Sequence, residues 1–194
     1  MNWTRLGRDA DHPAGIARYL VRDDTLYVWC DGTRNTQEWR WNFMTRKLVV
    51  GEMGARINWA DWEQSLDVWC AMSRALDGVE RFKTVRIGGY SRGYAIALGL
   101  AWLFATVTFA KNITVIGWAG KRVGNRAFHE QLDAWGVVHV NLSLRYDIVP
   151  CLPPWYARGF QNWERTRYWP VKAHVESGKD AALWRYAVAT TEES

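Results

Sequence analysis

One stretch decides the fold of this chain: Val85-Arg86-Ile87-Gly88-Gly89-Tyr90-Ser91-Arg92-Gly93-Tyr94-Ala95-Ile96-Ala97, in which an apolar strand runs through a tight turn into an apolar helix. The turn has the pattern Gly89-x-Ser91-x-Gly93. A serine between strand and helix in this pattern is typical of a nucleophile elbow, which lifts the hydroxyl above the end of the strand. Glycines suit both flanking positions because a Cβ there would press on the packing behind the turn. The alternative interpretation is an ordinary serine in a glycine-rich turn.

Length and composition predict one globular domain over residues 1–194, with a catalytic core at about 16–186. Apolar residues make up 48% of the chain and charged residues 23%, which is enough to build a packed core. Residues 1–11 carry both signs of charge and lack the apolar segment of a secretory signal. The longest apolar stretch, 95–110, is too short to cross a bilayer. We therefore expect a cytoplasmic protein, with release by another route left open.

The distribution of charge argues against a nucleic-acid partner. The formal net charge is +5, but the basic residues are spread along the chain instead of forming a basic tail. Attraction to anionic substrates, or transient contact with a membrane surface, stays possible on this balance. The sequence leaves the oligomeric state open.

Cysteine usage indicates neither a disulfide framework nor a metal site. The chain has three cysteines, Cys30, Cys70 and Cys151, an odd number without the spacing of metal ligands. We expect reduced, structural thiols.

Strand and helix patterns alternate along the chain. We expect a hairpin from residues 16–21 and 25–30, later strands at 84–88, 112–118 and 137–144, and helices at 61–76, 92–107 and 125–135. This order predicts an α/β fold, with a mostly parallel sheet, helices on both faces and an N-terminal β-hairpin. Reactive loops then gather at the carboxyl ends of the strands, where Thr33, Ser91 and Asp147 all fall.

A serine nucleophile needs a histidine base and an acid that orients it. Asp147 follows a predicted strand and is our candidate acid; a turn or helix-capping aspartate is the alternative. His174 is the candidate base, with a surface histidine as the alternative. Chain position assigns structural roles to the other three histidines, His12, His129 and His139.

Three motifs together resemble the class 3 lipases, an α/β-hydrolase family. They are the elbow at 89–93, the segment Lys121-Arg122-Val123-Gly124-Asn125 beside the family's "PRVGN", and Asp147-Ile148-Val149-Pro150-Cys151-Leu152-Pro153-Pro154 beside "DIVPxLPP". The resemblance covers roughly residues 24–175. It implies a serine esterase or lipase that forms an acyl-enzyme on Ser91, with Asp147 as the acid. His174, assigned from its position in the chain, completes the expected triad, and we expect no metal or organic cofactor.

The same resemblance implies an oxyanion hole built from the backbone N–H groups of Thr33 and Arg92, with the Thr33 hydroxyl beside it. The substrate is expected to be a small-molecule or lipid ester. The segment 153–169 is rich in aromatic residues and arginines, which favours either an acyl pocket or a loop packed over the sheet edge. The candidate substrate-binding residues are Tyr90, Trp155 and Tyr156.

The chain departs from the family pattern in five respects. Arg92 stands where the family usually has leucine, Tyr94 replaces a second glycine, and Asp31 stands in place of arginine. His174 follows Asp147 by only 27 residues, and the usual lid insertion is missing. Cys30-Asp31-Gly32-Thr33 and the elbow also resemble bacterial secretion-system phospholipase effectors.

Two further functions stay open at this point. The first is a phospholipase acting on anionic phospholipids, favoured by Arg34 and Arg92. The second is a non-catalytic binding module of hydrolase fold, favoured by the altered neighbours of the elbow.

Overall fold

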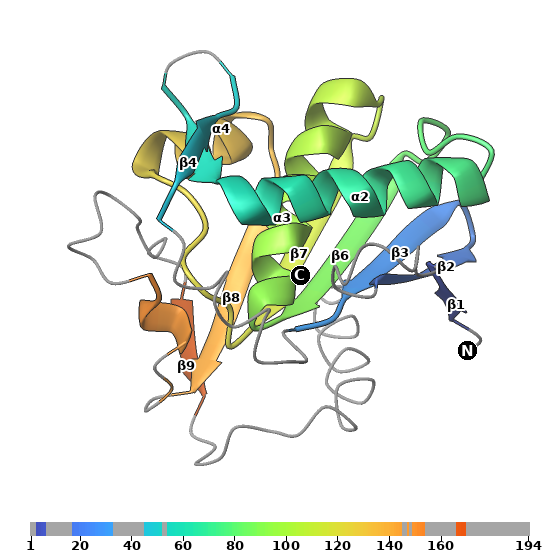
Figure 1. Ribbon diagram of the computed structural model, residues 1–194. Helices are drawn as coiled ribbons and strands as arrows, with labels where there is room; N and C mark the ends of the chain where they lie inside the picture. The colour runs from blue at the N-terminus through green and yellow to red at the C-terminus, as the bar shows by residue number, and fades with distance from the viewer. Residues whose placement is uncertain are drawn as a thin grey trace.

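A central sheet organises the computed structural model of the chain, which describes residues 3–6, 17–32, 45–51, 54–144, 147, 149–153 and 166–169 (Figure 1). Among these residues the main sheet has seven strands, in the order β1-β2-β3-β6-β7-β8-β9. Its strands are β1 (Thr4–Arg5), β2 (Ala17–Arg22), β3 (Thr25–Cys30), β6 (Thr84–Tyr90), β7 (Asn112–Trp118), β8 (Val138–Leu144) and β9 (Thr166–Trp169). β1, β2 and β3 pair antiparallel with one another in turn. β3, β6, β7, β8 and β9 follow and pair parallel. The expected α/β class with a mostly parallel sheet and an N-terminal hairpin is confirmed.

The turn of the β2–β3 hairpin is made by two aspartates. Arg22 pairs with Thr25, and both residues between them, Asp23 and Asp24, have positive φ, at 49° and 63°. Two successive positive φ angles match the twist of a two-residue hairpin, and aspartate tolerates this conformation better than most residues.

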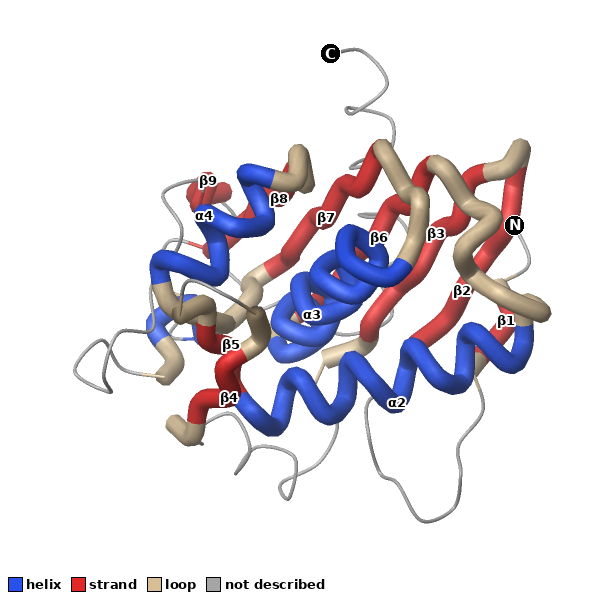
Figure 2. The backbone as a smooth tube through the Cα atoms, turned by 90° about the horizontal axis from the view of Figure 1, so that it is seen from above, coloured by secondary structure: helices blue, strands red, loops and turns tan. Residues whose placement is uncertain are grey.

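Helices connect the parallel strands: α2 (Trp59–Ala75), α3 (Arg92–Val107) and α4 (Arg126–Ala134). Each connection steps to the next strand in one direction across the sheet, from β3 to β6, β7 and β8. Right-handed crossovers that all step the same way place their helices on the same face. Figure 2 shows these three helices over one face of the sheet, and the described residues include no helix on the other face, where helices were also expected.

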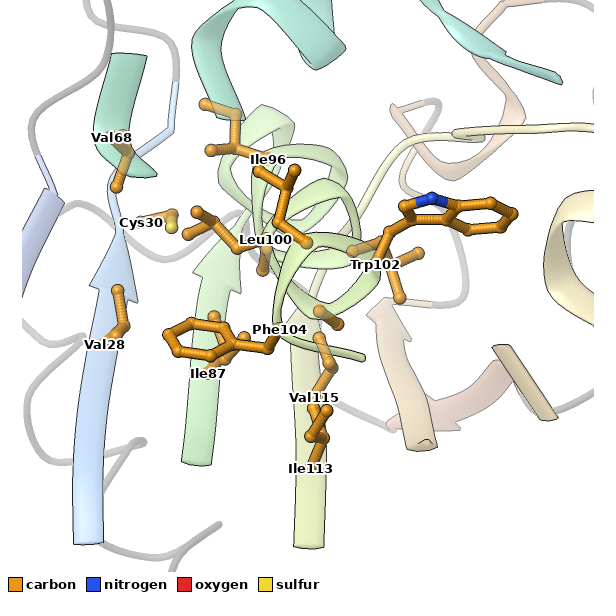
Figure 3. Close-up of a cluster of buried hydrophobic side chains, with 14 of the residues drawn as sticks. Val28, Cys30, Val68, Ile87, Ile96, Leu100, Trp102, Phe104, Ile113 and Val115 are labelled. Atoms are coloured by element: carbon orange, nitrogen blue, oxygen red, sulfur yellow. The ribbon is translucent and has the colours of Figure 1, made fainter. Parts of the chain in front are cut away.

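The core lies between the helices and that face of the sheet. α3 is buried along most of its length and packs on β6 and β7, so its central residues touch side chains of three strands. Figure 3 shows this cluster, with Leu100 and Phe104 of α3 among Val28, Ile87 and Val115 of the strands. The opposite face has a smaller cluster around Trp29 and Ile116.

Some short elements were not predicted. β4 (Lys47–Val49) and β5 (Arg56–Asn58) form a separate antiparallel pair, η1 (Val149–Cys151) is a single 3₁₀ turn, and β9 adds to the edge of the main sheet beside β8. β9 occupies part of the segment in which an acyl pocket or edge loop was expected. None of the described helices has both the length and the apolar character that a bilayer crossing requires.

Candidate active site

Ser91 lies between β6 and α3 in a strained backbone conformation. Its φ is 54° and its ψ is −117°, a region that residues other than glycine rarely adopt. Its N–H donates to the carbonyl of Trp118 at the end of β7, 2.8 Å away. The side chain makes no capping hydrogen bond to α3, so the hydroxyl is not engaged by its own helix. This is the geometry expected of a nucleophile elbow.

Close packing explains the glycines on either side of Ser91. A Cβ on Gly89 would overlap the backbone of Gly93, and a Cβ on Gly93 would overlap the carbonyl of Cys30. The bulky Tyr94 is accommodated because its ring lies against Gly117 and Gly120 in the next strand and loop, where any Cβ would overlap it. The two unusual neighbours of Ser91, Arg92 and Tyr94, therefore leave the elbow intact.

The loop after β3 reaches the elbow at Gly32. A Cβ on Gly32 would stand 2.9 Å from the carbonyl oxygen of Tyr90 and 3.3 Å from the Cβ of Ser91. Asp31, 7% exposed, fixes the start of this loop, because its carboxylate accepts hydrogen bonds from Arg18 Nη2 and Trp29 Nε1, each at 3.1 Å. Thr33 itself lies outside the described residues.

The loop between β7 and α4 links the elbow to the segment that contains Asp147. Arg122 N donates to Leu152 O at 2.8 Å, and Arg122 Nη1 reaches Pro153 O at 3.3 Å. The side chain of Asn141 in β8 bonds both the N–H and the carbonyl of Gly120, at 2.9 Å each. The structure thus brings the three motifs of the sequence together.

Asn125, the last residue of the second motif, has a structural role. Its Oδ1 caps α4 through Phe128 N and also accepts from Arg56 N, while its Nδ2 donates to Gly54 O. These contacts attach the start of α4 to the β4–β5 pair.

Asp147 lies beyond the end of β8, at the same edge of the sheet as Ser91. Its Oδ1 accepts a hydrogen bond from Val149 N at 2.9 Å, and its Oδ2 is buried. The capping role considered from the sequence is therefore present. It uses one carboxylate oxygen and fixes the orientation of the other.

Tyr90 is the one candidate substrate-binding residue that lies within the described part of the chain. It is half-buried and packs with the Trp29–Ile116 cluster on the face away from the helices. His174, Trp155 and Tyr156 lie outside the described residues, as does Arg34.

Two of the remaining histidines are buried against each other between α4 and β8. His129 of α4 and His139 of β8 are 2% and 1% exposed, and their ring centroids are 5.5 Å apart. His139 Nε2 lies 3.4 Å from Asp133 Oδ1. Burial, and then the charge of His139, lowers the pKa of His129 to about 3.

The lowered pKa of His129 predicts that acid weakens the fold. An unfolded chain takes up this proton as pH falls through about 6.5, whereas the folded chain resists it until about pH 3. His129 therefore stabilises the folded state fully above pH 6.5, and the free energy of unfolding falls below that by up to about 1.4 kcal/mol per pH unit. His129→Gln is expected to lose less stability than wild type between pH 6.5 and 4, measured by urea unfolding. Parallel losses in the two proteins would contradict the assignment.

Sequence reasoning missed a buried charge cluster behind the elbow. Arg92 Nε lies 3.2 Å from Oδ1 of Asp61 in α2, and Lys121 Nζ lies 2.8 Å from Oδ2 of the same carboxylate. All three residues are at most 2% exposed. The guanidinium of Arg92 thus faces Asp61 and not a substrate head group, which removes its support for an anionic phospholipid. The sequence signal for this cluster was the presence of two cations, Arg92 and Lys121, at motif positions where the family has leucine and proline.

No described group of three or more histidine, cysteine or acidic side chains is arranged to hold a metal ion. The three cysteines are free thiols, with Cys30 buried and Cys70 and Cys151 exposed. Burial and the neighbouring charge of Asp31 raise the pKa of Cys30, which keeps it protonated.

A parallel sheet with a serine elbow after a central strand, and an aspartate beyond a later strand, defines an α/β-hydrolase. The family model described as Lipase (class 3) matches residues 27–157. The chain therefore belongs to the class 3 lipase family. No curated protein sequence matches it.

Solved fungal lipases have a similar fold. A fungal lipase–inhibitor complex is 22% identical with a TM-score of 0.69, Rhizomucor miehei triacylglyceride lipase is 21% identical with 0.67, and lipase II from Rhizopus niveus is 22% identical with 0.63. Each match covers 81% of this chain and 63% of the other. The chain thus spans less than two thirds of the length of these lipases.

Proposed function

We propose that this protein is a serine esterase that cleaves carboxylic esters, with lipid esters as its substrate class. Ser91 attacks the ester carbonyl, and His174 takes the serine proton and later delivers it to the leaving alcohol. Asp147 holds the imidazole in the required tautomer and stabilises its protonated form. Water then releases the acid from the acyl-enzyme.

The observation that supports this function best is the backbone of Ser91. Strain at a residue other than glycine persists only where its surroundings impose it, and here Gly32, Gly89, Gly93 and the Trp118 carbonyl do so. The turn opens α3, so the N–H of Arg92 lies at a helix N-terminus, where partial positive charge favours an oxyanion.

The second oxyanion donor is assigned to the backbone of Thr33. Its neighbour Gly32 approaches Ser91 so closely that a side chain there would not fit. Asp31 anchors the strand end from which this loop leaves, through Arg18 and Trp29. A preorganised donor of this kind is worth about 100- to 1,000-fold in kcat.

Lipid esters are favoured as substrates by family membership and by the names of the solved neighbours, one of which is a triacylglycerol lipase described as having a serine protease triad. Arg92 does not favour an anionic phospholipid, because its side chain is buried against Asp61. The intact elbow, in turn, disfavours a non-catalytic binding module.

A panel of p-nitrophenyl esters of graded acyl length, together with labelling by a fluorophosphonate probe, tests the function. We expect the probe to label one serine, and ester hydrolysis to increase with acyl length beyond the short soluble esters. Hydrolysis of neutral glyceride and of anionic phospholipid vesicles, compared in parallel, separates the two lipid classes. A folded protein that neither takes the probe nor cleaves any ester would contradict the proposal and favour the binding module.

A further inference from the structure

The buried cluster of Asp61, Arg92 and Lys121 joins three segments that meet under the elbow. Asp61 is in the first turn of α2, Arg92 is the first residue of α3, and Lys121 is in the loop after β7. One carboxylate contacts both cations, through Oδ1 to Arg92 and Oδ2 to Lys121. Arg92 Nη2 also approaches the carbonyl of Ala60 at 3.4 Å.

Asp61 is itself held rigidly. The side chain of Asn58 caps α2 by accepting from Ala60 N at 3.0 Å and Asp61 N at 3.4 Å. The hydroxyl of Ser65 bonds the carbonyls of Asp61 and of Ile96 in α3, at 2.8 and 3.1 Å. The carboxylate is therefore a fixed point against which α3 is placed.

Residue 92 links this cluster to the reacting atoms. Its side chain is in the cluster, while its backbone N–H is the oxyanion donor of the proposed function. We propose that Asp61 is a positioning residue for the oxyanion hole: by binding Arg92 and Lys121 at once, it fixes the first residue of α3 beside Ser91. This inference rests on the proposed function, which it deepens.

Electrostatics explain why one carboxylate matters here. Two cations and one anion lie together in a buried space, where the carboxylate of Asp61 contacts both positive charges. Burial lowers the pKa of Lys121, and the charge of Arg92 adds to this, while Asp61 opposes both effects. Without Asp61 the two cations repel each other, and Arg92 must move with the backbone that it carries.

A double-mutant cycle of Asp61→Asn and Arg92→Gln tests the positioning role. kcat and KM are measured per active site titrated with the fluorophosphonate probe, so that loss of folded protein is not counted as loss of rate. Each single variant is expected to lower kcat by about 10- to 100-fold and to leave KM within about twofold, because ester binding does not use these residues. The double variant is expected to be no slower than the slower single, because Asp61 acts through Arg92.

Asp133→Asn is the matched control, because this carboxylate also lies beside a buried basic side chain, that of His139, but is on α4. Wild-type kcat per site in both single variants, or losses that multiply in the double, would overturn the inference. If Asp61→Asn fails to fold, the double variant, with both charges removed, must show the same kcat as Arg92→Gln. Absence of probe labelling in the wild type would instead count against the proposed function.

Discussion

Ser91→Ala is expected to lower kcat for ester hydrolysis by about 100,000-fold and to abolish labelling by a fluorophosphonate probe. The reason is that the Ser91 hydroxyl is the group that forms the acyl-enzyme in the proposed mechanism. The melting temperature should change little, because the hydroxyl makes no capping hydrogen bond to α3 and alanine adds no atom to the packed turn.

The measurement compares wild type, Ser91→Ala and Ser73→Ala, the last being a serine of α2 away from the elbow. Mass spectrometry of the labelled protein locates the acyl or phosphonyl group. An acyl-enzyme that still forms in Ser91→Ala would assign the nucleophile to another residue.

Asp147→Asn is expected to lower kcat by about 10,000-fold with little change in stability. Asparagine keeps an oxygen that can accept from Val149 N, so the turn into η1 is retained. It removes the negative charge that stabilises the protonated histidine and sets its tautomer. Asp147→Ala should lose the turn contact as well and cost about 1 kcal/mol of stability.

His174→Ala should match the loss in Asp147→Asn, whereas His12→Ala should leave kcat unchanged. In the wild type, activity is expected to fall on the acid side of the pH profile as the base takes up a proton. Near wild-type turnover in Asp147→Asn would move the acid to another carboxylate. Asp31 is the next candidate acid from the sequence, but its carboxylate already accepts hydrogen bonds from Arg18 and Trp29.

The larger elements could be predicted from local pattern. Continuous apolar runs placed α3 at 92–107 and β7 at 112–118, both as observed. The pair β4–β5 and the edge strand β9 could not be predicted, because strands of three or four residues have no periodicity of their own and form through their partners. The order of the strands in the sheet, which places the described helices on one face, could likewise not be predicted from the spacing of apolar residues along the chain.

The parts of the candidate site that lie within short sequence motifs could be predicted. The turn around Ser91 and the position of Asp147 follow from short contiguous patterns. The contact between Asp61 and Arg92 joins residues 31 apart, and the motif comparison marked Arg92 only as unusual. A polar residue in the first turn of a helix normally faces solvent, so Asp61 gave no sign that it is completely buried.

The end of β7 and the loop that follows it have a consequence for how the proposed enzyme could change its substrate. Trp118 at the end of β7 holds Ser91 through its carbonyl, and Arg122 in the loop holds the Asp147 segment through its N–H and the Leu152 carbonyl, so main-chain atoms connect the proposed nucleophile to the segment of the proposed acid. Side chains at the mouth of the site can then vary without disturbing that connection. In such a molecule, selection can change the range of substrates through the side chains at the mouth of the site, while the main-chain contacts that position the reacting residues stay constant.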